Sequence, residues 1–148
     1  DLFDSLAVIA EHKENLLINS EKQNQLPRKC KILLVEDNEI NQVLAESLLE
    51  DLGAVVDIAN NGKHAIEFLN KKHYDLVLMD CQMPVLDGYE ATKEIRKSNK
   101  GYQDIYIIAM TANAIAGDRE KCLNAGMNEY ISKPIDFSEL RKRLIQGL

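Results

Sequence analysis

Polar residues able to do chemistry follow four separate apolar runs in this 148-residue sequence. Glu36 and Asp37 come after the first run, Asp80 after another, and Thr111 and Lys133 after two more. Three carboxylates brought together would raise one another's pKa values unless a cation neutralised them. Hard oxygen ligands favour Mg²⁺, which often also binds a phosphate of the substrate. These residue types therefore predict a magnesium site.

Phosphoryl transfer is the chemistry that fits such a site. Lys133 supplies a cation and Thr111 a hydroxyl, and both can bond phosphoryl oxygens as charge builds in the transition state. Of the Ser, Cys and His residues only Cys81 directly follows one of the acids, and carboxylates do form aspartyl-phosphates. We expect Asp80 to be the nucleophile. One such acid alone is more often a helix cap or a solvated loop residue, and only the whole set favours a site.

The elements that must position these residues alternate between short β-type runs and helical periodicity from Lys31 onward. The predicted strands are 31–36, 54–59, 75–80, 105–110 and 129–132, and the predicted helices are 38–52, 63–72, 88–99, 115–125 and 136–146. Runs such as ILLV and LVLM are typical of parallel strands covered on both faces. We predict an α/β, doubly wound (βα)5 domain with strand order 2-1-3-4-5. Its first and third strands would adjoin at the ligand-binding crevice.

Length and composition favour one compact domain at 30–148, preceded by a helix and linker at 1–29. A net charge of −6 argues against nucleic acid or an anionic membrane surface as the partner. No apolar stretch approaches the roughly 18 residues that span a bilayer, and the three cysteines lack the spacing of metal ligands. We therefore expect a cytoplasmic chain. Because the chain begins at Asp1 rather than Met, we also expect it to be a fragment of a longer protein.

Four motifs resemble the receiver domain of two-component response regulators: LLVEDNEINQ, DLVLMDCQMPVLDGYEAT, IIAMTANA and YISKPI. The similarity covers about 30–148, and the first two motifs are most similar to receivers attached to hybrid sensor histidine kinases. The resemblance implies a flavodoxin-like fold and a place in a phosphorelay. A histidine kinase dimerisation domain would be the phosphodonor, and a histidine-phosphotransfer domain would be the partner. The parent would be a hybrid kinase of the inner membrane, with self-phosphorylation and autodephosphorylation as this fragment's own activity.

The resemblance also assigns roles to the acidic residues by position. Asp80 would accept the phosphoryl group from a phosphohistidine. Glu36 and Asp37 would hold Mg²⁺ together with Asp80 and the backbone carbonyl of Gln82. The lifetime of the aspartyl-phosphate would depend on Gln82 and Asn113.

The remaining roles fall on the last two strands. Lys133 and Thr111 would bind phosphoryl oxygens, and a cis bond before Pro134 would aim the lysine inward. Tyr130 would be a switch aromatic that turns when Thr111 is drawn toward the phosphoryl group. The alternative for Tyr130 is simple packing at the sheet edge with its hydroxyl in water.

The predicted helix 38–52 carries apolar residues on two arcs. At about 100° per residue, the arc expected to face the sheet contains Leu44, Ala45, Leu48 and Leu52. Ile40 and Val43 fall outside it and are either scattered surface apolar residues or a docking patch. The resemblance favours docking, because receivers of this kind meet histidine-phosphotransfer bundles through this helix.

Other function classes make different demands on the sequence. An aspartate-nucleophile phosphatase would resemble D-x-D-x-[TV] at its nucleophile, whereas position 82 is Gln. An inactive, receiver-like interaction module would be supported by the loss of an acid or of the lysine, and all are present. A flavin-binding domain would need a Ser/Thr/Gly-rich loop after its first strand, where EDNEI stands instead.

Overall fold

The computed structural model describes residue 26 and residues 29–83, 85–112 and 116–148, the side chains of 116–118 excepted. The predicted N-terminal helix, and Asn113, lie outside the described residues. In chain order the elements are β1 (Lys31–Val35), α2 (Glu39–Asp51), β2 (Val55–Ala59), α3 (Gly62–Lys71), β3 (Leu76–Asp80), α4 (Gly88–Lys97), β4 (Tyr106–Thr111), α5 (Ala116–Ala125), β5 (Glu129–Ser132) and α6 (Phe137–Gly147). Every predicted boundary from Lys31 onward agrees within two residues. Among the described residues, no helix combines the length and hydropathy of a bilayer-spanning segment.

The five strands form one parallel sheet in the order β2-β1-β3-β4-β5, as predicted. Val35 pairs with Met79 in the register between β1 and β3. The residues that follow this pair, Glu36 and Asp80, therefore lie side by side at the carboxyl ends of β1 and β3. On the other side of β3, Thr111 ends β4 opposite Ser132 of β5. The residues singled out in the sequence thus share one edge of the sheet.

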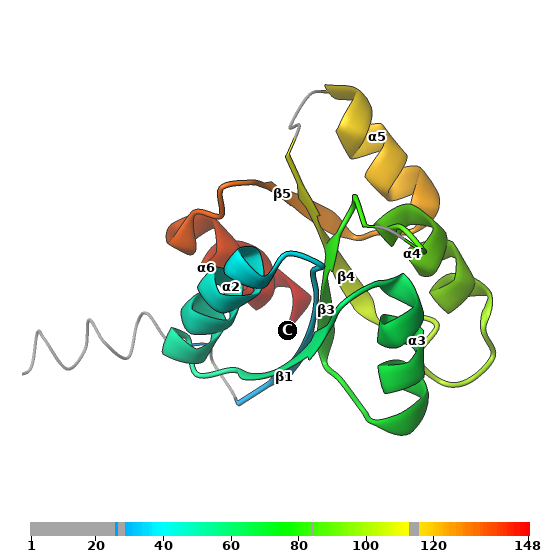
Figure 1. The fold of residues 1–148 in the computed structure, drawn as a ribbon, viewed down its shortest axis with the longest axis horizontal. Helices are drawn as coiled ribbons and strands as arrows, with labels where there is room; N and C mark the ends of the chain where they lie inside the picture. The colour runs from blue at the N-terminus through cyan, green and yellow to red at the C-terminus, as the bar shows by residue number, and fades with distance from the viewer. Residues whose placement is uncertain (1–25, 27–28, 84, 113–115) are drawn as a thin grey trace, which may run out of the picture.

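Helices cover both faces of the sheet, with α2 and α6 on one side and α3, α4 and α5 on the other (Figure 1). Alternate strand residues feed the two cores, because successive side chains of a strand point to opposite faces. Leu33 and Val35 pack toward α3 to α5, and Ile32 and Leu34 pack toward α2 and α6. All five residues of β3 are buried. Burial on both faces holds the strand that carries Asp80 in the centre of the domain.

Side-chain caps fix where the helices begin. Asn38 accepts hydrogen bonds from the N–H groups of Ile40 and Asn41 at the start of α2. Asn61, Asp87 and Asp136 cap α3, α4 and α6 in the same way. Because Asn38 follows Asp37 directly, this cap also sets the turn by which the acidic residues leave β1.

The core face of α2 differs from the predicted arc. Ala45, Leu49 and Leu52 are buried, whereas Leu44 is 59% exposed and Leu48 is only partly buried. The buried stripe runs at i, i+4 and i+7, so α2 is rotated relative to our prediction. The prediction was wrong for Leu44 because the helix carries more leucines than one face can bury, and spacing alone does not choose among them. Leu44 instead joins Ile40 and Val43 on the solvent side.

Candidate functional site

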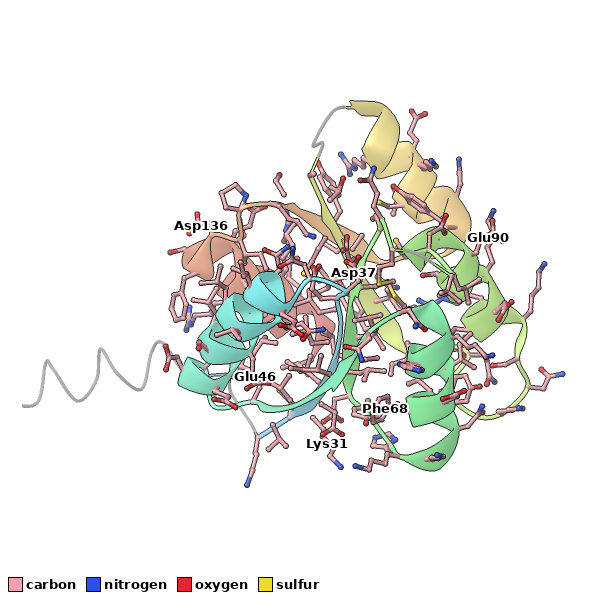
Figure 2. The ribbon with its side chains drawn as sticks, viewed as in Figure 1. Lys31, Asp37, Glu46, Phe68, Glu90 and Asp136 are labelled. Carbon is pink, nitrogen blue, oxygen red and sulfur yellow. The ribbon has the colours of Figure 1, made fainter. Side chains whose placement is uncertain are left out.

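The carboxyl ends of β1 and β3 bring three acidic side chains together. One carboxylate oxygen each from Glu36, Asp37 and Asp80 lies within 4.8 Å of the others. Glu36 and Asp80 are buried, and Asp37 is exposed where β1 passes into α2 (Figure 2). A hollow of about 190 Å³ opens onto these acids and is also lined by Thr111 and Lys133. The predicted catalytic and metal-binding side chains therefore line one cleft.

Lys133 bridges the two buried acids. Its Nζ lies 3.0 Å from Glu36 Oε2 and 3.2 Å from Asp80 Oδ2. Its backbone N–H donates to the carbonyl of Thr111 at 2.8 Å, and the bond to Pro134 is cis, as predicted. The lysine is thus fixed at its backbone beside β4, while its ammonium reaches β1 and β3.

Backbone donors and one amide side chain hold the acids in place. The Gln82 N–H donates to Asp80 Oδ1 at 3.2 Å, and the Asn38 N–H donates to Glu36 Oε1 at 3.2 Å. Gln42 Nε2 donates to the carbonyl of Glu36 at 2.6 Å. Each buried carboxylate therefore accepts one hydrogen bond from backbone and one from Lys133. Protein groups therefore orient both carboxylates.

The electrostatics of the cleft favour an added cation. Burial, followed by the negative charge of Glu36, raises the pKa of Asp80 to about 6. Burial alone would raise the pKa of Glu36, but its bonds to Lys133 and Asn38 outweigh burial and lower it. Burial likewise opposes the ammonium of Lys133, whose pKa the two carboxylates nevertheless raise. With all three acids ionised, one lysine leaves two negative charges unbalanced.

These residues fit a small divalent cation. Three converging carboxylates are hard ligands, and a 2+ ion would balance the charge that Lys133 leaves. Mg²⁺ is held in proteins by one or a few carboxylates and completes its octahedron with water or phosphate oxygen. Gln82, predicted to offer its carbonyl, lines the same hollow. The donor set therefore matches the predicted metal.

Thr111 and Tyr130 lie in different surroundings. Thr111 is buried and lines the hollow, as expected of a residue that would meet a phosphoryl oxygen. Tyr130 pairs in register with Ala109, is partly buried and packs against the core beneath α3 to α5. A switch role for Tyr130 stays a prediction.

Sequence reasoning missed two supporting residues of the cleft. Asn41 lines the hollow, and Gln42 Nε2 also donates to Asn60 Oδ1 at 2.9 Å, which links α2 to the end of β2. Both residues stand in the motif LLVEDNEINQ, so the signal was present in the sequence. Their side chains could be assigned only once the first turn of α2 was placed over Glu36.

An apolar surface adjoins the cleft on α2. Ile40, Val43 and Leu44, which we call the α2 patch, are 72%, 65% and 59% exposed. Beside the patch, Leu44, Leu48 and Ile135 help to line a hollow of about 360 Å³ that also touches Lys133. The predicted docking residues are thus exposed next to the acids, with Leu44 as a member that the sequence had assigned to the core.

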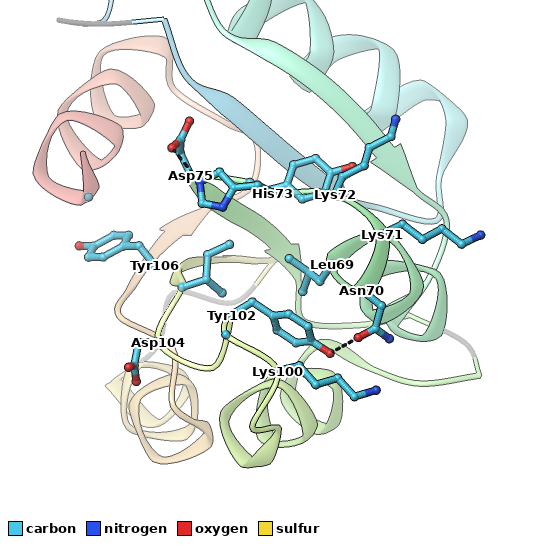
Figure 3. A pocket seen from close by; sticks show the side chains of 14 residues that line it. Leu69, Asn70, Lys71, Lys72, His73, Asp75, Lys100, Tyr102, Asp104 and Tyr106 are labelled. Atoms are coloured by element: carbon cyan, nitrogen blue, oxygen red, sulfur yellow. Dashed lines mark hydrogen bonds and ion pairs between the residues drawn. The ribbon is translucent and has the colours of Figure 1, made fainter.

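A larger hollow, of about 730 Å³, lies at the other end of the strands (Figure 3). It is lined by the turns before β3 and β4, where Tyr102 donates to Asn70 Oδ1 at 2.7 Å and His73 lies 3.7 Å from Asp75. Because parallel strands place all their carboxyl ends at the opposite edge, none of the predicted site residues lines it. Size alone therefore does not mark the reactive cleft.

A family model described as response regulator receiver domain matches residues 32–145. Probable histidine kinase 1 of Oryza sativa subsp. indica is 40% identical over 93% of this chain and 17% of its own length. The signal transduction histidine-protein kinase BarA of Escherichia coli K12 is 36% identical over 98% of this chain and 16% of its own length. The chain therefore spans less than a fifth of these relatives.

Solved structures resemble the fold as well. The receiver domain of a sensor histidine kinase from Pseudomonas aeruginosa PAO1, with a magnesium ion coordinated in its active site cleft, is 49% identical with a TM-score of 0.72. That match covers 80% of this chain and 96% of the other. The receiver domain of Ssk1 from Saccharomyces cerevisiae, in complex with the histidine phosphotransfer protein Ypd1, is 33% identical with a TM-score of 0.71. It covers 81% of this chain and 92% of the other.

Proposed function

Since the chain belongs to the response regulator receiver domain family, we propose that it accepts a phosphoryl group on Asp80 from a phosphohistidine. The observation that carries the proposal is the meeting of Glu36, Asp37, Asp80 and Lys133 in one cleft at the carboxyl edge of the sheet. The curated relatives are histidine kinases several times longer than this chain. A hybrid histidine kinase is accordingly the parent that we propose.

The transfer forms one bond and breaks another. A carboxylate oxygen of Asp80 attacks the phosphorus, the bond between phosphorus and the imidazole nitrogen breaks, and the imidazole keeps the electron pair. Lys133 already lies 3.2 Å from Asp80, so its ammonium can follow the charge onto the phosphoryl oxygens. Thr111 lines the same hollow and can donate its hydroxyl to another of these oxygens.

Glu36, Asp37, Asp80 and the carbonyl of Gln82 would hold Mg²⁺. The bound ion would neutralise the carboxylates and polarise the phosphoryl group. Asp37 is exposed and would lie on the open side of the cleft, where the phosphoryl group would enter. Glu36 is buried and is held by hydrogen bonds from Lys133 and Asn38. The related receiver with magnesium in its cleft supports this assignment.

The phosphodonor would be a histidine kinase dimerisation domain, and the partner in the relay a histidine-phosphotransfer domain. We assign its docking to the α2 patch, because Ile40, Val43 and Leu44 are exposed beside the acids. The complex of a related receiver with Ypd1 supports a partner of this class.

Ile40→Asp tests the docking role. Because Ile40 is 72% exposed, the fold should keep its stability, whereas phosphotransfer from a partner should slow by about tenfold, the equivalent of one buried aliphatic side chain. Leu123→Asp, on α5, is the matched control and should transfer at the wild-type rate. Mg²⁺ binding should persist in both variants, and an equal loss of Mg²⁺ binding and transfer would count against docking.

Tyr130 is our candidate for the readout of phosphorylation. Movement of Thr111 toward the new phosphoryl group would open space into which the ring can turn, biasing the surface of α5 and β5. Tyr130→Ala should leave phosphorylation of Asp80 intact and remove the change in hydrogen exchange that phosphorylation causes at β5. An unchanged exchange response would assign Tyr130 to packing alone.

Labelling by a small phosphodonor tests the function itself. Incubation with acetyl phosphate and Mg²⁺ should add one phosphoryl group to the intact mass, and chelation of the metal should prevent it. Asp80→Asn should abolish the adduct, whereas Asp104→Asn, an exposed aspartate elsewhere, should keep it. An adduct that survives in Asp80→Asn would refute the assignment.

A further inference from the structure

Two cysteine side chains meet in the core on the α3 to α5 side of the sheet. The sulfur of Cys81 lies 4.0 Å from the sulfur of Cys122, and the two residues are 2% and 1% exposed. Both are thiols. Cys81 directly follows Asp80 at the end of β3, whereas Cys122 belongs to α5, which covers the same face as α4 (Figure 1). The pair therefore connects the strand that carries Asp80 to a helix 41 positions further along the chain.

The third cysteine of the chain lies in a different core. Cys30 precedes β1, at the edge of the sheet opposite to the acids, and packs with the residues under α2 and α6. Cys81 and Cys122 pack with the residues under α3 to α5. The sheet therefore separates Cys30 from the pair, so Cys30 can serve as an internal control.

A small molecule can reach the pair from the side of Cys81. Cys81 lines a hollow of about 490 Å³, and Cys122 is not among the residues that line it. Gln82 and Thr111 line both this hollow and the reactive cleft, so the two adjoin. The sulfur of Cys81 is accordingly the one that a small oxidant would meet first.

Burial sets the speed of oxidation at this sulfur. Burial raises the pKa of the Cys81 thiol to about 12, and a hydrogen bond with Tyr89 offsets that effect only in part. Little of the reactive thiolate is therefore present in neutral solution. The pair should resist brief exposure to an oxidant and respond to sustained exposure. Once Cys81 is oxidised, Cys122 lies close enough to capture it.

We propose that a hydroperoxide converts Cys81 and Cys122 to a disulfide, and that this bond slows the phosphorylation of Asp80. With hydrogen peroxide, the sulfur of Cys81 attacks one oxygen, the O–O bond breaks, and a sulfenic acid and one water form. The sulfur of Cys122 then attacks the sulfur of Cys81, the S–O bond breaks, and a second water leaves. The two sulfurs together lose two electrons to the peroxide, and the two thiol protons end in the waters.

The bond would displace groups that position the phosphoacceptor. Since bonded sulfurs lie about 2 Å apart, the two sulfurs must approach by about 2 Å, a movement shared between β3 and α5. Cys81 stands between Asp80 and Gln82, and the Gln82 N–H donates to Asp80 Oδ1. A displacement of about 1 Å can slow a reaction by up to about a hundredfold, so we expect phosphorylation to slow about tenfold. This effect on Asp80 rests on the proposed function, whereas formation of the disulfide does not.

Mass spectrometry tests the disulfide without any phosphodonor. The full chain, incubated with millimolar hydrogen peroxide for a day, should lose the mass of two hydrogen atoms. A peptide pair that joins Cys81 to Cys122 should appear, and dithiothreitol should remove it. Cys30→Ala should behave as the wild type, whereas Cys122→Ala should gain oxygen without forming this pair. A disulfide to Cys30, oxygen added to Cys81 in the wild type, or no reaction at all would overturn the inference.

Labelling by acetyl phosphate, after the peroxide is removed, tests the effect on the cleft. The disulfide form of the wild type should be labelled about tenfold more slowly than the reduced form, and dithiothreitol should restore the rate. Cys30→Ala should show the same slowing and the same recovery. Equal rates in the disulfide and reduced forms would overturn the inference. Failure of the reduced wild type to be labelled would instead refute the proposed function, and the disulfide would still be read from the mass.

Discussion

Replacing Asp80 by asparagine should abolish phosphorylation and yet stabilise the fold. The side chain of Asp80 is 5% exposed and lies beside Glu36 in a cleft that holds more negative than positive charge. Burial and then the charge of Glu36 raise its pKa from 3.8 to about 6. In neutral solution the folded chain therefore holds this carboxylate ionised at a cost that the unfolded chain does not bear. An amide of the same shape removes that cost.

The size of the gain follows from the pKa. The difference between 3.8 and about 6 corresponds to about 3 kcal/mol, at about 1.4 kcal/mol per pH unit. Because Glu36 and Lys133 readjust when the charge is removed, we expect about 1–3 kcal/mol. A raised pKa stabilises the protonated form. The contribution of the Asp80 carboxyl group to the stability of the fold is fully present below pH 3.8 and is lost as the pH rises through about 6. The advantage of Asp80→Asn should accordingly be full above pH 6 and vanish below about pH 4.

Urea unfolding in the presence of a chelator measures this difference. At about pH 7.5 Asp80→Asn should unfold at a higher urea concentration than the wild type, and at about pH 4 the two should coincide. Asp104→Asn, which removes an exposed charge, should change stability by less than about 0.5 kcal/mol at either pH. A variant less stable than the wild type at neutral pH, or a gain in stability that is equal at both pH values, would show that the charge of Asp80 does not destabilise the fold.

Three further substitutions probe the frame of the domain, one beside the cleft and two at the opposite end of the sheet. In Gly88→Ala the new Cβ would collide with the carbonyl oxygen of Asp80. We therefore expect the free energy of unfolding in urea to fall by about 2 kcal/mol and labelling by acetyl phosphate to slow. Unchanged labelling would contradict this expectation. Tyr74→Phe removes the 2.6 Å hydrogen bond that the Tyr74 hydroxyl donates to Asp57 and that lowers the pKa of Asp57. This bond contributes to the stability of the fold above pH 3.8, and the contribution is lost below that pH. Its cost of about 1 kcal/mol should therefore shrink in acid unfolding, and an equal cost at every pH would be inconsistent. Arg96→Met deletes four hydrogen bonds at the far end of the sheet, and should cost about 3 kcal/mol while labelling of the remaining folded chain stays normal. Impaired labelling would show that this end of the sheet is coupled to the cleft.

The positions of the elements could be predicted because each signal is local. Apolar runs mark the strands, and capping residues such as Asn38 and Asp87 mark the helix starts. The convergence of Asp37, Asp80 and Lys133 follows from one further fact, that parallel strands place their carboxyl ends at the same edge. The strand order itself came from the arrangement common to such folds, since no residue in the sequence encodes which strands adjoin.

Features that depend on packing between elements could not be predicted. The rotation of α2 that buries Leu49 and exposes Leu44 is decided by fit against the sheet, and several leucines satisfy the same helical period. Val85 has a left-handed conformation, with a φ of +72°, in the loop where Leu86 bonds to the start of α3, and this contact joins segments distant in sequence. The ion pair between Glu36 and Lys133 joins residues 97 positions apart. Sequence supplied their charges but not their contact.

Chemical mapping of the phosphorylated residue is the sharpest test of Asp80 as the phosphoacceptor. The chain is labelled with acetyl phosphate and Mg²⁺, reduced with borohydride so that an aspartyl-phosphate becomes homoserine, and sequenced by tandem mass spectrometry. The expected result is conversion at Asp80 alone, with no conversion when Mg²⁺ is chelated. Conversion at Glu36 or Asp37, or phosphorylation of a histidine in place of Asp80, would contradict it.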